Sequence, residues 1–271
     1  MNRHPHFFSR DIEGFGAKIP FVVTTLIQKL RELDAKKIQG IFRLSGSIDV
    51  IKQLQDELDE GFVKDWKPYN GITISCALKT YFRYSPTPLM TFEKYDEFMS
   101  ATSLPNEEDF LAKIKELCFS LPKTRLLTLV YLINYLHEVD ANSEVNKMKA
   151  NNLAICLAPN ILRSVSTANA AADNPQQNKI VTALIEHSLE FFSEVGFPPP
   201  VFMSIEEITI MKNSYINETD IDLMVQRANY RKESLISYTP PEYINDSNFK
   251  RPTRIVNAKK KKRPSNIQAE E

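Results

Sequence analysis

The sequence predicts an all-α fold: a bundle of about eight or nine helices followed by a C-terminal extension. Apolar residues recur at three- and four-residue steps in one segment after another, as they do on the buried face of a helix. No alternating apolar and polar pattern of useful length indicates a strand. The 271 residues are 42% hydrophobic and 25% charged, near the average for globular proteins, so helices can pack around a sizeable core.

Four helices are expected in the first hundred residues. The first covers residues 19–36 and carries apolar side chains one turn apart. Ser47 is a good N-cap for the second helix, which ends before Gly61. The third covers residues 73–83 and stops ahead of a proline. The fourth, over residues 92–101, is short and turns two aromatic side chains inward.

Four more helices are expected further along the chain. They begin near residues 105, 122, 146 and 175. An acidic first turn suits the positive end of the first of these. Pro122 opens the longest helix, and Pro159 ends the one that covers residues 146–157. Residues 164–174 are polar and rich in alanine, so we expect a loop there before Pro175 starts the last helix.

Composition divides the chain into a domain over residues 15–195 and an extension over residues 201–271. In the extension, residues 203–211 and 220–231 are expected to form short helices. The remainder reads as a basic, disordered tail, because it is polar and contains few large apolar residues.

Lys259 to Arg263 form an uninterrupted basic run in that tail. Such a run fits a solvated chain end, contact with an anionic membrane, or a nuclear-import signal. No signal peptide is visible, and no apolar stretch reaches the roughly 20 residues that cross a bilayer. We therefore expect a cytoplasmic protein that associates with membranes, if at all, through this run.

Charge and motif content exclude several classes of function. The 34 Lys and Arg balance the 34 Asp and Glu, which argues against nucleic acid as a partner. Neither a Gly-rich phosphate loop nor a dinucleotide fingerprint is present. Cys76, Cys118 and Cys156 have no zinc-site spacing, and the four histidines are scattered. We expect no metal, no cofactor and no self-contained active site.

Residues 40–47, with the sequence G-I-F-R-L-S-G-S, form an unusual link between two helices. The two glycines permit a tight loop, and Ile41 and Phe42 can anchor it in the core. Arg43 would then project from a fixed base and offer a planar, permanently charged donor fork to a partner's phosphates. The alternative is a surface arginine without a role.

Two other segments are unusual for a plain helical bundle. In L-K-T-Y-F-R-Y-S-P-T-P-L, residues 78–89, Lys79 and Arg83 lie four apart and share one helical face. Two cations in this arrangement call for an anion or a group of backbone carbonyls opposite them. In N-N-L-A-I-C-L-A-P-N-I-L-R, residues 151–163, Asn152 lies within an apolar helix, where its amide needs a hydrogen-bond partner.

Together and in this order, the three segments resemble the RhoGAP domain, the GTPase-activating module for Rho-family small GTPases. Phe15-Gly16 followed by Ile19-Pro20 is also similar to the start of that domain. The resemblance covers about residues 15–192 and implies an all-helical bundle, in agreement with the apolar periodicity.

The resemblance also implies a function: this chain activates a Rho/Rac-type small GTPase in its GTP-bound state and is not itself an enzyme. Arg43 matches the arginine finger that enters the GTPase's nucleotide site in trans. Lys79 and Arg83 match the basic pair that holds the finger loop and meets the GTPase. Asn152 matches the asparagine that supports the interface and the finger. GTP and Mg²⁺ are then bound by the partner, and this chain needs no cofactor.

Some positions depart from the family pattern. Gln39 stands in place of the usual Glu, and Tyr84 in place of an acidic residue. Leu157-Ala158 replaces the common Phe-Gly. These departures indicate a divergent member. Two alternatives therefore stay open: a catalytically weak RhoGAP-like binding module, and a membrane-recruited adaptor for small GTPases.

Overall fold

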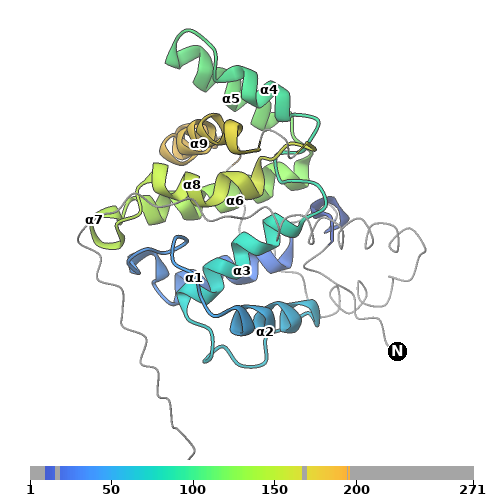
Figure 1. Ribbon diagram of the computed structural model, residues 1–271, viewed down its shortest axis with the longest axis vertical. Coiled ribbons are helices and arrows are strands. Elements are labelled where there is room, and N and C mark those ends of the chain that lie inside the picture. The colour runs from blue at the N-terminus through green and yellow to red at the C-terminus, as the bar shows by residue number, and fades with distance from the viewer. Residues whose placement is uncertain (1–9, 16–18, 167–169, 194, 196–271) are drawn as a thin grey trace, which may run out of the picture.

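The computed structural model describes residues 10–15, 19–166, 170–193 and 195. Every regular element in these residues is helical, which confirms the all-α prediction (Figure 1). The elements are η2 (Ile12–Phe15), α1 (Phe21–Glu32), η3 (Ala35–Lys37), α2 (Ile48–Asp59), α3 (Gly71–Tyr84), α4 (Tyr95–Ala101), α5 (Glu107–Phe119), α6 (Lys123–Asp140), α7 (Ser143–Asn146), α8 (Ala150–Ile161), α9 (Ala170–Glu186) and α10 (Ser188–Phe191). Across these elements, no helix is long and apolar enough to cross a membrane.

The helices pack in successive layers (Figure 1). Helix α3 contacts α1, α2 and α8, and α9 contacts α8, α6 and α4, while α4 and α5 lie at the end opposite α2. Helix α6 is at the centre, and twelve of its 18 residues are buried. The buried apolar side chains form one continuous core, and the loops between the layers are anchored on it.

Side-chain caps place the starts of two helices. Asn70 accepts a hydrogen bond from Thr73 N at 2.9 Å, so α3 begins at Gly71, two residues earlier than the apolar pattern predicts. Asn106 caps α5 in the same way. Ser47 does occupy the N-cap of α2, but its side chain makes no capping hydrogen bond, so that part of the prediction is wrong.

The boundaries of two predicted helices, over residues 19–36 and 146–157, differ from those in the structure. The first helix ends at Glu32 rather than at residue 36, because Asp34 takes a left-handed conformation (φ 48°). The predicted 146–157 helix is divided: α7 ends at Asn146, Lys147 is left-handed (φ 60°), and α8 begins at Ala150. Apolar periodicity does not register a single left-handed residue, so both breaks escape it.

Both prolines that were expected at helix ends lie inside helices. Pro159 is in the last turn of α8, where its missing N–H removes only one hydrogen bond. Pro175 lies within α9, and residues 170–174, predicted to be a loop, are helical. Alanine has the highest helix propensity, and Tyr95 OH donates to Asp173 Oδ2 at 2.6 Å, which ties this turn to α4.

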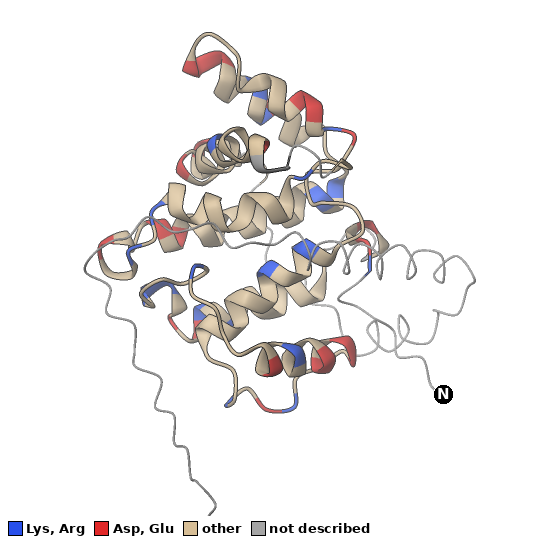
Figure 2. Cartoon of the chain, viewed as in Figure 1, with Lys and Arg blue, Asp and Glu red and all other residues tan. Residues whose placement is uncertain are grey.

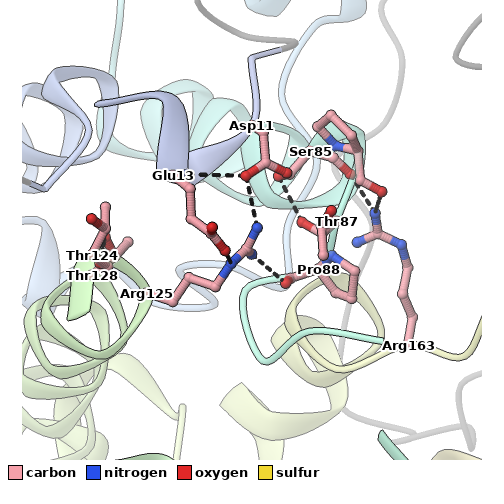
Figure 3. Close-up of polar contacts among 10 residues, drawn as sticks. Asp11, Glu13, Ser85, Thr87, Pro88, Thr124, Arg125, Thr128 and Arg163 are labelled. Atoms are coloured by element: carbon pink, nitrogen blue, oxygen red, sulfur yellow. Dashed lines mark hydrogen bonds and ion pairs between the residues drawn. The ribbon is translucent and has the colours of Figure 1, made fainter. Parts of the chain in front are cut away.

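Two buried arginines fix the turn after α3, residues 85–88 (Figure 3). Arg125, in the first turn of α6, is 1% exposed and donates to Asp11, Glu13 and Pro88 O at 2.6–2.8 Å. Arg163, just after α8, donates to Ser85 O, and to Phe82 O at 3.3 Å. We call these contacts the arginine clasp. It lies at the start of α6, an 18-residue helix about 27 Å long.

Candidate functional site

The segment over residues 38–47, here called the Arg43 loop, joins η3 to α2. It lies on the side of the molecule where α7 lies (Figure 1). Ile41 and Phe42 are both 0% exposed, and the Phe42 ring packs edge-on against Tyr135 of α6 at 6.2 Å. The predicted apolar anchor is therefore present, and it faces the central helix.

The backbone of the Arg43 loop is tightly turned. Gly40 O accepts hydrogen bonds from Arg43 N at 3.0 Å and Leu44 N at 2.9 Å. Gly40 has φ 73°, and a Cβ there would lie 2.9 Å from Leu44 Cγ, so only glycine fits without adjustment. Phe42 also has positive φ (65°), a conformation that costs free energy in a residue with a side chain. The fold must hold this loop in place from outside.

Three contacts from neighbouring helices do so. Lys79 of α3 donates a hydrogen bond to Phe42 O. Cys76, one turn earlier on α3, donates through its thiol to Leu44 O at 3.4 Å. On the other side, Gly40 N donates to Asn146 O at the end of α7, at 2.8 Å. The loop is thus held through its backbone on both sides of Arg43.

Arg43 itself is half-buried, and within the described part of the chain no hydrogen bond or ion pair engages its guanidinium. Its positive charge nevertheless affects the pKa of a thiol on α8. Burial raises the pKa of the Cys156 thiol, and the positive charges of Lys79 and Arg43 oppose that rise. Both cations thus act electrostatically on the Cys156 thiol of α8, while the guanidinium donors of Arg43 have no hydrogen-bond or ion-pair partner in the described residues.

Lys79 and Arg83 both belong to α3, and both are half-buried. The expectation that a backbone carbonyl would lie opposite the pair is met at Lys79, which contacts Phe42 O. Figure 2 shows Lys and Arg on α3 and on the segment that precedes α2. The structure thus brings Arg43 and Lys79 together, and Arg83 lies one turn farther along the same helix.

Asn152 lies in the first turn of α8 and is half-buried. Its Nδ2 donates to Lys147 O at 3.4 Å, in the corner between α7 and α8, rather than to the Arg43 loop. The expected hydrogen-bond partner is therefore a local backbone carbonyl. Asn152 and the Arg43 loop are linked indirectly: Asn152 contacts Lys147 O, and the loop contacts the neighbouring Asn146 O.

Leu157 and Ala158, which depart from the family pattern, are both 0% exposed. They face the core, so this departure changes the packing of α8 and not its outer face. Gln39, by contrast, is exposed at the start of the Arg43 loop.

Sequence reasoning missed two residues of this site. Asn146 is fully buried and contacts the Arg43 loop, yet the apolar pattern only marks it as a helix start. Cys76 reads in the sequence as an ordinary core cysteine. No signal in the sequence singles out Asn146, because it lies in a polar stretch, residues 142–149, in which only Val145 and Met148 are apolar.

Several predictions fall outside what the structure describes. The extension over residues 201–271, with its expected short helices and the basic run Lys259 to Arg263, lies beyond the described residues. Its membrane or nuclear role, and the cytoplasmic location, stay predictions. In the described residues, no group of His, Cys, Asp and Glu could hold a metal ion.

Comparison with known proteins matches this arrangement to one family. The family model described as "RhoGAP domain" matches residues 20–166. Rho GTPase-activating protein 21 of Mus musculus is 36% identical over 200 residues, which cover 71% of this chain and 10% of that protein. The T-cell activation Rho GTPase-activating protein of Homo sapiens is 32% identical over 167 residues, 60% of this chain and 23% of that protein. The chain thus matches only a minor part of these curated relatives.

Solved structures agree on the fold. The BH domain from Graf, described as the GTPase regulator associated with focal adhesion kinase, superposes with a TM-score of 0.59 at 29% identity. The match covers 64% of this chain and 93% of that one. Human Rho GTPase activating protein 15 superposes with a TM-score of 0.65 at 22% identity, over 70% of this chain and 93% of that one.

Proposed function

Because this chain belongs to the RhoGAP domain family, we propose that it accelerates GTP hydrolysis by a Rho/Rac-type small GTPase through an arginine finger, Arg43. The GTPase binds GTP and Mg²⁺ and positions the attacking water. Arg43 enters that nucleotide site in trans. Water attacks the γ-phosphorus, the bond to the β–γ bridging oxygen breaks, and GDP and inorganic phosphate form. The guanidinium stabilises the negative charge that develops during this step.

The observation that carries the proposal is the contrast between the backbone of the Arg43 loop and its side chain. The backbone is held by Lys79, Cys76 and Asn146, while no group in the described residues engages the guanidinium. A charged donor that is held at its base loses little freedom when it enters a partner's site, so most of its interaction is available to the transition state. An arginine with a purely structural role would have its donors satisfied internally.

Lys79, Arg83 and Asn152 have supporting roles in this proposal. Lys79 holds the loop at Phe42 O and, with Arg83, presents positive charge to the acidic face of a nucleotide-loaded GTPase. Asn152 stabilises the corner at the start of α8, beside which the GTPase docks.

Single-turnover GTP hydrolysis by a panel of Rho-family GTPases tests the proposal, with the wild type and Arg43→Ala compared at saturating concentration. We expect the wild type to accelerate at least one GTPase and the substitution to reduce this acceleration by about 10³-fold or more. Binding to the GTPase loaded with a non-hydrolysable GTP analogue should persist. Lys113→Ala, on the surface of α5, is the matched loss of a cation elsewhere.

Either of two results would contradict the proposal. If the wild type binds a GTPase without accelerating hydrolysis, the chain is a binding module or an adaptor. If Arg43→Ala accelerates hydrolysis as well as the wild type, the chain activates the GTPase without a finger at this position.

A further inference from the structure

Asn146, the last residue of α7, is 0% exposed and makes an unusually complete set of hydrogen bonds. Its Nδ2 donates to Lys36 O at 2.7 Å and to Val139 O at 2.6 Å. Its Oδ1 accepts from Met148 N at 2.6 Å. Both amide protons and the amide oxygen are therefore engaged, and two carbonyls facing one end define which atom is nitrogen.

The main chain of Asn146 adds a fourth contact, to the Arg43 loop. Its carbonyl accepts from Gly40 N at 2.8 Å, while its side chain donates to Lys36 O. One residue thus clamps residues 36–40 at both ends. This is the stretch that leads into the turn carrying Arg43.

The same corner also sets the start of α8. Lys147, left-handed at φ 60°, follows Asn146 directly, and its carbonyl accepts from Asn152 Nδ2. Met148 N is held by Asn146 Oδ1. Hydrogen bonds at Asn146 therefore hold both the Arg43 loop and the residues that lead into α8.

We propose that Asn146 is a positioning residue: it fixes where Arg43 stands relative to α8, and so controls the hydrolysis step rather than the binding of the GTPase. This inference rests on the finger role proposed above. Gly40 O accepts from both Arg43 N and Leu44 N, so a shift of Gly40 passes directly to Arg43. A displacement of about 1 Å can cost on the order of 10² in rate.

The test compares the wild type with Asn146→Ala and the milder Asn146→Ser, whose hydroxyl cannot reach both carbonyls. Single-turnover hydrolysis at saturating concentration gives the maximal rate, and titration with the analogue-loaded GTPase gives the affinity. We expect the maximal acceleration to fall by about 10²-fold for Asn146→Ala and less for Asn146→Ser, with affinity changed by less than about threefold. Arg125→Met is the control, because it removes buried polar contacts at the opposite end of α6.

Hydrogen exchange supplies a readout that does not depend on activity. In the wild type, the Gly40 amide should exchange slowly, since Asn146 O accepts its proton. Asn146→Ala should speed exchange within residues 36–44 more than in α9. A merely structural role would speed exchange throughout the bundle and leave the maximal rate of the folded fraction unchanged.

These readouts separate the two proposals. If the wild type accelerates no GTPase, the finger proposal fails, while slow exchange at Gly40 still supports the clamp. If the wild type is active and a folded Asn146 variant keeps the full maximal rate, the positioning role is overturned. Fast exchange of the wild-type Gly40 amide overturns the clamp even if no Asn146 variant folds.

Discussion

Arg43 and Arg125 have the same type of side chain in opposite surroundings. Arg125 is 1% exposed, and its donors contact two carboxylates and a carbonyl in the arginine clasp (Figure 3). Arg43 is half-buried, and among the described residues its guanidinium makes neither a hydrogen bond nor an ion pair. The two lie toward opposite ends of the bundle, since α6 begins at the clasp and ends at the corner that holds the Arg43 loop.

The contrast separates stabilising an internal turn from acting on another molecule. In the clasp, the side chain makes the contacts and the backbone it bonds is held as a result. In the Arg43 loop, other residues hold the backbone, and the side chain stays available. A guanidinium whose donors are all used cannot contact a phosphate without breaking internal hydrogen bonds, each worth about 1.5–3 kcal/mol when charged. The function of an arginine therefore follows from what holds its backbone.

The largest effect on stability is expected from Arg125→Met. The substitution leaves Asp11 and Glu13 without their cation and Pro88 O without its donor. Because the carboxylates are 32% and 53% exposed, water partly replaces the arginine, and we expect a loss of about 3 kcal/mol in the free energy of unfolding. Thermal denaturation should show a midpoint lowered by roughly 6–12 °C.

If Arg125 is purely structural, its substitution should lower stability without lowering the acceleration of GTP hydrolysis. Measured well below the denaturation midpoint, Arg125→Met should accelerate GTP hydrolysis within about twofold of the wild type. Arg43→Ala should show the reverse pattern, with a midpoint within about 2 °C of the wild type, because among the described residues its guanidinium has no hydrogen bond or ion pair to lose. A large drop in activity for the folded Arg125 variant would mean that the two ends of the bundle are coupled.

A smaller effect, on rate, is expected from Lys79→Met. The methionine keeps most of the apolar stem but leaves Phe42 O, a carbonyl in a strained turn, without its charged donor. Since such a hydrogen bond is worth about 1.5–3 kcal/mol, the maximal acceleration should fall by roughly 10- to 100-fold. Single-turnover hydrolysis measures this. Lys113→Met is the control, because among the described residues the ion pair of Lys113 is with Glu116, at the surface of α5. Equal activities of the two variants would show that Lys79 does not hold the loop.

The sequence predicts the helices well where apolar side chains repeat, and poorly where one residue changes the chain's direction. Helices α2, α3, α5 and α6 follow from periodicity and their flanking prolines or caps. The breaks at Asp34 and Lys147 each depend on a left-handed residue that is not glycine, so the sequence carries no glycine to mark them. The start of α9 depends on the contact between Asp173 and Tyr95, far apart in sequence.

The candidate site, like the helices, could be predicted only in part from the sequence. Arg43, Lys79, Arg83 and Asn152 were predicted as site residues because they lie in segments that resemble a family. The hydrogen bond from Lys79 to Phe42 O fits the resemblance, which implies that the basic pair holds the finger loop. The contacts of Cys76 with Leu44 O and of Gly40 N with Asn146 O were not predicted, because each uses a backbone atom of the loop and leaves no trace in residue identity. Partners of Asn152 were likewise expected, but the carbonyl of Lys147 could not be named before the corner was known.

The smallest effect is expected at the weakest of the three contacts, from Cys76→Ala. A thiol is a poor donor, and its contact with Leu44 O is long at 3.4 Å, so its loss should lower the maximal acceleration by only about twofold. Cys118→Ala is the matched control, since Cys118 is fully buried in α5 and makes no contact with the Arg43 loop that the described residues record. Both variants should lose stability from the removed sulfur, while only Cys76→Ala should change the rate. A larger loss for Cys76→Ala than for Lys79→Met would mean that Leu44 O, rather than Phe42 O, is the contact on which the position of Arg43 chiefly depends. The expected order of rate losses, largest for Asn146, then Lys79, then Cys76, would then place Cys76 before Lys79.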